Sequence, residues 1–224
     1  MSRVVTLSEA VKAVNRRGIL LVFPAANQAD PPSLWSELYP RSRMRWEWND
    51  DGDDRVGELW HLRARLARSG KVLYSKWYRG RATLISRPVF RAMLRVAHER
   101  GDPGAGLGPE SRQLLGLLEE NSPQSTRSLR TEADLTGKPL EAVYTRALKE
   151  LWTRLLIVGA GEVDDGAFPS LAIGATKLLF EDLWATREES NADDARFLDA
   201  ALAGSPAFAR FFKQLRTQPQ PRGA

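Results

Sequence analysis

The sequence predicts a mainly α-helical protein with short β-hairpins, organised as winged helix-turn-helix units. Apolar residues recur at helical spacing in several segments, which indicates amphipathic helices. Two other segments combine β-branched and aromatic residues with turn signals, as hairpins do. In the second half of the chain three helical patterns precede a hairpin pattern, which is the order of elements in a winged helix. This order is the most specific architectural signal in the chain.

The first hundred residues predict an N-terminal basic module, 1–100, of helices and one hairpin. Thr6 and Glu9 have the spacing of a capping box, and Gly18 ends the helix that they begin. The apolar run 19–23 fits either a buried strand or a continuation of the core. The predicted elements are a helix over 6–18, a helix over 30–40, an amphipathic helix over 54–71, a hairpin over 71–87 and a helix that begins at Ser86.

A segment rich in glycine and proline, 100–110, predicts the boundary to a winged-helix domain over 109–176. The predicted elements of that domain are helices over 109–121, 125–135 and 138–155, and strands over 155–163 and 167–175 joined by a "DDG" turn. We expect C-terminal helices over 177–217 and a frayed tail over 218–224.

The composition is that of a folded globular protein, with 42% hydrophobic and 27% charged residues in 224. The chain has no cysteine and only two histidines, which excludes disulfides and thiol catalysis and argues against a metal site. The longest apolar run, 18–26, is too short to cross a bilayer, and no leader pattern precedes it. We therefore expect a cytoplasmic protein without a membrane span, metal or cofactor. The acidic run 48–54 is expected to be a solvated loop.

The distribution of charge is more informative than its total. Between Arg63 and Arg100 there are eleven basic residues and one acidic residue, Glu99, a net of +10 in a chain whose total is +5. An asymmetry of this size indicates that one region of the protein meets an anionic partner. Alternatively, these arginines pair with acidic residues elsewhere in the fold.

The segment "KVLYSKWYRGRATLISR" (71–87) is the predicted phosphate-binding surface, and its rings either stack on bases or cover the core. The third helix of the predicted winged helix would add contacts in the major groove. Against this, Asp164 and Asp165 in the adjacent turn would repel phosphate, and the basic residues of that helix also suit an ordinary solvated face. The predicted DNA-binding residues are Lys71, Lys76, Arg79, Arg81, Arg87, Arg91, Arg95, Arg146 and Lys149.

Three segments resemble the winged-helix DNA glycosylase family, whose members excise alkylated or crosslinked bases. "NQADPPSLWSELYP" (27–40) is similar to the glutamine-rich active-site segment of that family. The stretch 58–94 is similar to its Arg-rich helix and hairpin, and the stretch from "LLGLLEEN" to "FPSLAIGA" (114–175) to its later winged helix. The resemblance implies duplex DNA as the partner and hydrolysis of a glycosidic bond as the reaction.

The resemblance also implies an active site of two polar residues separated by one. Gln28 and Asp30 have this spacing, and they would orient a water molecule and stabilise an oxocarbenium-like sugar. Trp35 or Tyr78 would stack on the extruded base.

Two alternatives apply to this pair. In a second alignment the two positions fall on Asn27 and Ala29, and the second catalytic group is missing. Asp30 directly precedes Pro31, and is equally suited to be a helix N-cap without a catalytic duty.

The leading hypothesis is therefore a DNA-binding protein related to winged-helix glycosylases. One alternative is a non-catalytic winged-helix protein that binds DNA or regulates transcription. Another is a protein-interaction module whose basic segment, 63–100, docks an acidic partner. The sequence specifies neither the lesion nor the oligomeric state.

Overall fold

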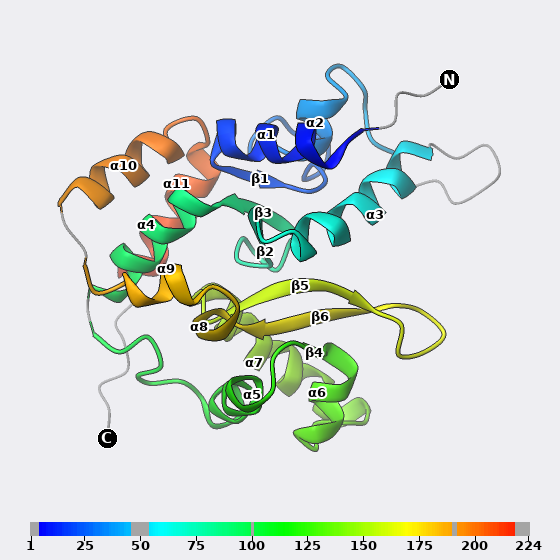
Figure 1. Cartoon of the computed structure of the whole chain (residues 1–224), viewed down its shortest axis with the longest axis vertical. Helices are drawn as coiled ribbons and strands as arrows, with labels where there is room; N and C mark the ends of the chain where they lie inside the picture. Colours follow the sequence, from blue (N-terminus) through cyan, green and yellow to red (C-terminus); the bar gives the residue numbers. More distant parts are fainter. Residues whose placement is uncertain (1–4, 46–53, 100, 190–191, 218–224) are drawn as a thin grey trace.

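The computed structural model describes residues 5–45, 54–99, 101–189 and 192–217. Its central feature is an antiparallel sheet of six strands in the order β1-β3-β2-β5-β6-β4, which runs from the top to the bottom of Figure 1. The strands are β1 (Ile19–Leu21), β2 (Val72–Ser75), β3 (Thr83–Ser86), β4 (Gln124–Ser125), β5 (Ile157–Val163) and β6 (Ser170–Ala175).

The first half of the chain runs helix, strand, helix, helix, strand, strand. The predicted capping box begins α1 (Leu7–Arg17): the Glu9 N–H donates to Thr6 Oγ1 over 3.2 Å, and the Thr6 N–H donates to the Glu9 carboxylate over 2.9 Å. The helices α2 (Leu34–Leu38) and α3 (Asp54–Arg68) follow β1. Because β1 pairs with β3, this half forms the three-stranded unit β1-β3-β2.

The second half repeats this order of elements. Its strand β4 pairs with β6, as β1 pairs with β3 in the first half. Its helices are α5 (Pro109–Glu120), α6 (Thr126–Glu132), the 3₁₀ helix η1 (Lys138–Leu140) and α7 (Glu141–Thr153). The remaining helices are α4 (Arg87–His98), α8 (Thr176–Leu179), α9 (Glu181–Ala185), α10 (Ala192–Leu202) and α11 (Pro206–Thr217).

The two halves join where β2 lies beside β5, with Tyr74 opposite Gly159. A Cβ atom at Gly159 would lie 2.2 Å from Cδ1 of Tyr74, so the ring lies directly over the glycine backbone. Next to this contact, Arg63 of α3 forms an ion pair with Glu162 of β5, and both side chains are largely buried. A ring contact and a buried ion pair thus hold the two halves in one sheet.

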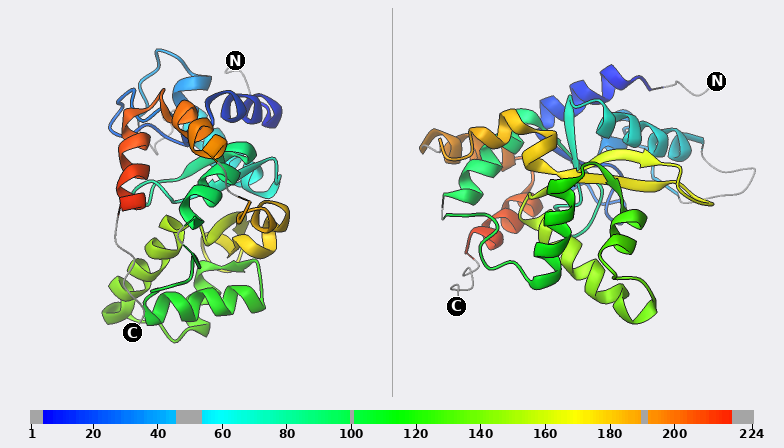
Figure 2. Two further views of the ribbon diagram at one scale, coloured as in Figure 1. Left: turned by 90° about the vertical axis from the view of Figure 1, so that its left-hand side faces the viewer. Right: turned by 60° about the horizontal axis from the view of Figure 1, so that its bottom comes forward.

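Helices cover both faces of the first half of the sheet. Leu20, Val72 and Leu84 point toward α1, α2 and α3, while Ile19 and Ile85 point toward α4, α10 and α11. The second half packs against α5, α6 and α7 in a third core. The left view of Figure 2 shows α10 and α11 beside the first half and the helices of the second half below them.

The prediction of a mainly α-helical fold with short hairpins and winged helix-turn-helix units is wrong. The protein is a mixed α/β structure, in which both predicted hairpins are central parts of one sheet. The sheet was missed because β1 and β2 pair with strands distant in sequence, and a short apolar run such as 19–23 has the same pattern in a core helix and a buried strand.

Several expected segments differ from the structure or lie outside it. The helix predicted over 30–40 is reduced to the five residues of α2, which Ser33 caps.

In the segment predicted as a domain boundary, residues 101–108 contain no helix or strand. Arg154 binds the carbonyl oxygens of Pro103 and Ala105 there, at 3.3 and 2.6 Å. Most of the acidic run 48–54 and the tail 218–224 lie outside the described residues. None of the described helices has the length and apolarity needed to cross a membrane.

We expect Gly159→Ala to lower the free energy of unfolding by roughly 1–3 kcal/mol, because the added methyl group would overlap the Tyr74 ring in a packed core. Chemical denaturation measures this difference. Gly116→Ala in α5 is the matched control, since a Cβ there meets no atom within 4 Å. The control should gain about 0.5–1 kcal/mol from the better helix propensity of alanine. Wild-type stability of Gly159→Ala would contradict the proposed role of this contact.

Candidate nucleic-acid interface

Three loops next to the β1 edge of the sheet form one surface. The Val22 N–H donates to the Ala82 carbonyl over 2.8 Å, so the segment after β1 lies beside the β2–β3 turn. The Asn27 side chain accepts from the Met44 N–H over 2.9 Å and donates to the Met44 carbonyl over 3.0 Å. Asn27 thus fastens residues 24–33 to the loop that contains Met44, and Val22, just before this segment, binds the β2–β3 turn. We call residues 24–33, 39–45 and 76–82 together the loop face.

The loop face contains four of the six non-glycine residues with positive φ in the described chain. They are Ala26 (φ 51°), Asn27 (φ 55°), Arg41 (φ 70°) and Arg79 (φ 51°). Each such conformation costs of order 1–3 kcal/mol and persists only where surrounding contacts enforce it, commonly at functional sites. The clustering therefore marks the loop face as a candidate site.

The two predicted catalytic residues differ in their surroundings. The Gln28 side chain is exposed, and its backbone N–H donates to the Ala25 carbonyl over 3.0 Å. Asp30 is half-buried, and both its carboxylate oxygens accept hydrogen bonds from the start of α11. The donors are the Ser205 hydroxyl and, over 2.9 Å, the Ala207 N–H. Gln28 is thus open to a ligand, whereas Asp30 is engaged within the protein.

Asp30 caps a helix, but not the helix that follows it in the chain. Ser33 caps the adjacent helix α2, because its hydroxyl accepts the Ser36 N–H over 3.1 Å. Asp30 instead caps α11, which begins 176 residues later in the chain. A carboxylate at the N-terminus of a helix is stabilised by the free N–H groups and by the helix dipole.

The two predicted base-stacking rings belong to the core. Trp35 is 1% exposed, and its indole N–H donates to the Ser42 carbonyl over 2.9 Å. Tyr78 is 4% exposed and packs edge-on against Phe208 and Phe211 of α11, at centroid distances of 5.0 and 5.1 Å. Neither ring has a face that an extruded base can reach in this structure.

The predicted basic hairpin is divided between the two ends of β2 and β3. Lys71 and Arg87 lie at the end next to α3 and α4, whereas Lys76, Arg79 and Arg81 lie at the end that forms the loop face. Four residues of strand separate the two groups, a length of roughly 13 Å. Only the second group belongs to the loop face, which also contains Gln28.

Three of the predicted DNA-binding residues have surroundings that compete with phosphate binding. Arg87 forms an ion pair with Asp182 and donates to the Gly70 carbonyl over 3.0 Å. Arg95 is 9% exposed and binds Glu189, Asp194 and the Thr186 carbonyl. Lys76 is half-buried, and burial together with the nearby charge of Arg63 lowers its pKa below the usual range.

The other predicted contacts are exposed. Arg79 and Arg81 lie on the loop face, and within the described chain neither pairs with an acidic residue. The Arg79 guanidinium lies over the Tyr78 ring, 5.4 Å from its centroid. The remaining exposed residues are Lys71 between α3 and β2, Arg91 on α4, and Arg146 and Lys149 on α7.

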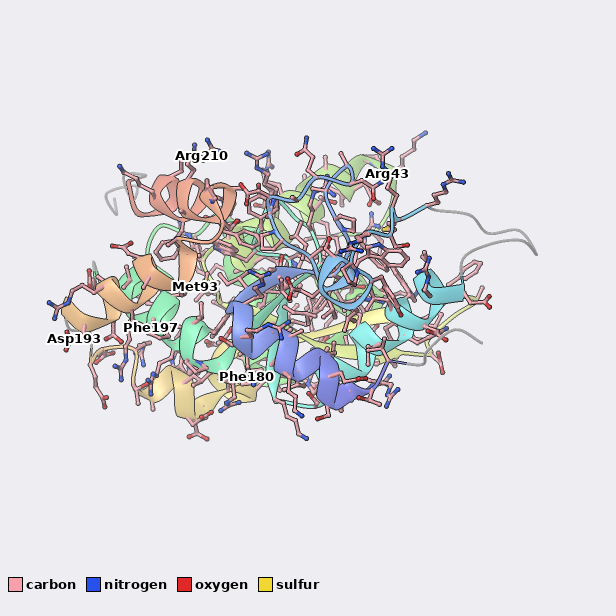
Figure 3. The ribbon with its side chains drawn as sticks, turned by 90° about the horizontal axis from the view of Figure 1, so that it is seen from above. Arg43, Met93, Phe180, Asp193, Phe197 and Arg210 are labelled. Atoms are coloured by element: carbon pink, nitrogen blue, oxygen red, sulfur yellow. The ribbon has the colours of Figure 1, made fainter. Side chains whose placement is uncertain are left out.

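Four further arginines on or beside the loop face were not predicted. Arg41, Arg43 and Arg45 follow α2, and Arg210 lies on α11; all four are exposed. Figure 3 shows Arg43 and Arg210 along the same edge of the molecule. The alternation of arginine with other residues in "RSRMR" was a usable signal for the first three. Arg210 had none, because only the folded chain brings α11 to these loops.

Candidate metal ligands do not cluster in the part of the chain that the structure describes. Over those residues, no three histidine, cysteine, aspartate or glutamate side chains gather in a way that could hold a metal ion.

We expect Asp30→Ala to lower the free energy of unfolding by about 1–2 kcal/mol, because Ser205 and Ala207 would lose their acceptor at the start of α11. Gln28→Ala changes an exposed side chain on the same loop, and should remain within about 0.5 kcal/mol of wild type. Urea denaturation of the two variants makes the comparison. Equal stabilities would show that Asp30 does not fasten α11 in solution.

Comparison with known proteins supplies the family. Residues 4–196, most of the chain, match the family model described as AlkZ related. AlkZ is a DNA glycosylase that acts in crosslink repair. No curated protein and no solved structure matches the chain significantly. The resemblance to a glycosylase family is confirmed at this level, and the chain belongs to the AlkZ-related family of glycosylase-like DNA-repair proteins.

Proposed function

We propose that this protein binds duplex DNA through the loop face and hydrolyses the bond between the sugar and an alkylated or crosslinked base. The observation that carries the proposal is the position of Gln28, an exposed amide on a constrained loop. This loop contacts α11 through Asp30, and the β2–β3 turn that bears the exposed Arg79 and Arg81 contacts the same helix through Tyr78. Family membership supplies the class of reaction, and the loop face supplies a surface suited to DNA.

The charge of the loop face supports DNA as the partner. Its three segments contain six basic residues and a single acid, Asp30, whose carboxylate oxygens are occupied by α11. Arginine and lysine side chains bind phosphates and release condensed counterions, which gives a sequence-independent and salt-sensitive affinity. Arg146 and Lys149 on α7 are proposed as a second set of contacts; in the left view of Figure 2, α7 and α11 both lie toward the left edge.

The proposed reaction assigns different duties to Gln28 and Asp30. The side-chain carbonyl of Gln28 would accept a hydrogen bond from water, which adds to C1′ of the sugar as the glycosidic bond breaks. The base leaves with the bonding electrons and takes up a proton. Because both Asp30 oxygens are already hydrogen-bonded, we assign Asp30 to holding the loop, with its negative charge favouring the cationic sugar. The stacking role expected of Trp35 and Tyr78 gains no support, since both rings are covered.

One observation favours a second candidate, a DNA-binding protein without catalysis. If Asp30 is engaged in capping α11, Gln28 is left as the one exposed member of the predicted catalytic pair. A single amide orients water less effectively than an amide and a carboxylate together. The two candidates share the DNA-binding surface and differ only in chemistry.

We expect the protein to bind a plain duplex with micromolar affinity at low salt, and the affinity to fall steeply as salt is added. Arg79→Glu with Arg81→Glu should weaken binding by about ten-fold or more, because two contacts become repulsive. Fluorescence anisotropy at several salt concentrations measures both effects. Lys12→Glu with Arg65→Glu makes the same charge change at exposed positions on α1 and α3, and should have a smaller effect. Salt-insensitive or absent binding would favour a protein-interaction module instead.

We expect Gln28→Ala to lower the rate of base release from an alkylated duplex by roughly 10²-fold or more, with duplex affinity nearly unchanged. The physical reason is that the water loses its orienting acceptor while the arginines remain. Single-turnover release of a labelled base measures the rate. Base release at the wild-type rate would exclude Gln28 from the reaction, and no release by the wild-type protein from alkylated and crosslinked duplexes would favour the non-catalytic candidate.

A further inference from the structure

We propose that α11 is part of the DNA-binding surface and that Arg210 contributes a phosphate contact to it; this inference rests on the proposed DNA binding. The helix begins at Pro206, beyond residues 4–196 that match the family model. The family match therefore gives no indication of what this helix does. The contacts of α11 with the loop face give that indication.

The start of α11 is fastened to the loop that carries Gln28. Asp30 binds both the Ser205 hydroxyl before the helix and the Ala207 N–H in its first turn. The Ser205 hydroxyl also accepts the Phe208 N–H over 3.3 Å. The orientation of α11 is thus fixed relative to the proposed catalytic loop and not only to the sheet.

One side of α11 is fastened to the β2–β3 turn through aromatic rings. Phe211 lies 5.1 Å from Trp77 and 5.1 Å from Tyr78, measured between ring centroids, and Phe208 lies 5.0 Å from Tyr78. Arg79 stacks its guanidinium on the same tyrosine. Tyr78 therefore links α11 to an exposed arginine of the loop face.

The opposite side of α11 carries Arg210. Phe208 and Phe212 are buried and mark the side of α11 that faces the core. Arg210 follows Phe208 by two positions, a rotation of about 200° around the helix axis, so its side chain points away from the core. Arg210 is exposed, and within the described chain no acidic side chain pairs with it. The helix has no acidic residue along its length, so nothing on it opposes a phosphate.

The positions of the exposed arginines fit a duplex backbone better than a point-like ligand. Arg43 and Arg210 lie along one edge of the molecule, as Figure 3 shows. The loop 39–45 contacts residues 24–33 through Met44 and Asn27, and those residues contact α11 through Asp30. The segment that bears Arg79 and Arg81 contacts α11 through Tyr78. Charges spread over several loops and a helix match a line of phosphates. The occupant we infer is therefore the sugar–phosphate backbone of DNA.

The test compares duplex binding by wild type, Arg210→Ala, Arg210→Lys and the control Lys12→Ala, by anisotropy at several salt concentrations. Lys12 is exposed on α1, which packs on the opposite face of the sheet from α11. We expect Arg210→Ala to weaken binding by roughly three- to ten-fold for every duplex sequence and to reduce the salt slope by about one. Arg210→Lys should restore most of the slope, since lysine also binds phosphate.

Each outcome decides the inference. If the salt dependence of duplex affinity in Arg210→Ala equals that of wild type, the role of α11 is overturned and the proposed DNA binding stands. A loss of equal size in Lys12→Ala would also overturn it, because it would show a general effect of charge. An absence of binding by wild type would overturn the proposed function itself. Circular dichroism of each variant confirms that the compared proteins are folded.

Discussion

The contact between Tyr74 and Gly159 is the constraint on which the rest of the structure depends. A side chain at Gly159 would collide with the tyrosine ring, and without this approach β2 and β5 have no shared edge. The neighbouring ion pair of Arg63 and Glu162 also holds the two halves together, because removal of one partner of a buried pair costs about 3–5 kcal/mol. Burial raises the pKa of Tyr74, so its hydroxyl stays protonated beside Arg63 despite the lowering effect of that charge. The β2–β3 turn begins directly after β2, and the joint therefore also sets the position of the loop face.

Ion pairs between distant segments account for part of the positive charge in 63–100. Arg63, Arg87 and Arg95 each bind an acidic residue from the second half of the chain or the helices after it. The charge asymmetry seen in the sequence thus partly records long-range pairing inside the protein. Buried and half-buried arginines of this kind hold segments together through several hydrogen bonds each. The charge that remains for a polyanion is smaller: Arg79 and Arg81 lie exposed on the loop face, whereas Lys71 and Arg91 lie elsewhere.

Local features of the fold could be predicted from the sequence, and long-range ones could not. The capping box of Thr6 and Glu9 and the helices of the second half follow from patterns within a few residues. The single sheet depends on pairing between strands more than 80 residues apart along the chain, which no local pattern encodes. Gln28 and Asp30 were found as a spaced pair, but the engagement of Asp30 by Ser205 and Ala207 depends on the fold. A carboxylate before a proline has the same sequence signature whether it caps a helix or acts on a substrate.

The loop face combines strain with several independent restraints, and this combination bears on how it binds. Ala26, Asn27, Arg41 and Arg79 hold unfavourable backbone conformations. The side-chain bonds of Asn27 to Met44 and of Asp30 to the start of α11 keep the loops in place against that strain. A loop already fixed in one conformation loses less entropy when a ligand binds, so more of the contact energy appears as affinity. The restraint that occupies Asp30 therefore does not argue against a site at Gln28, because it is part of what holds Gln28 and the arginines ready.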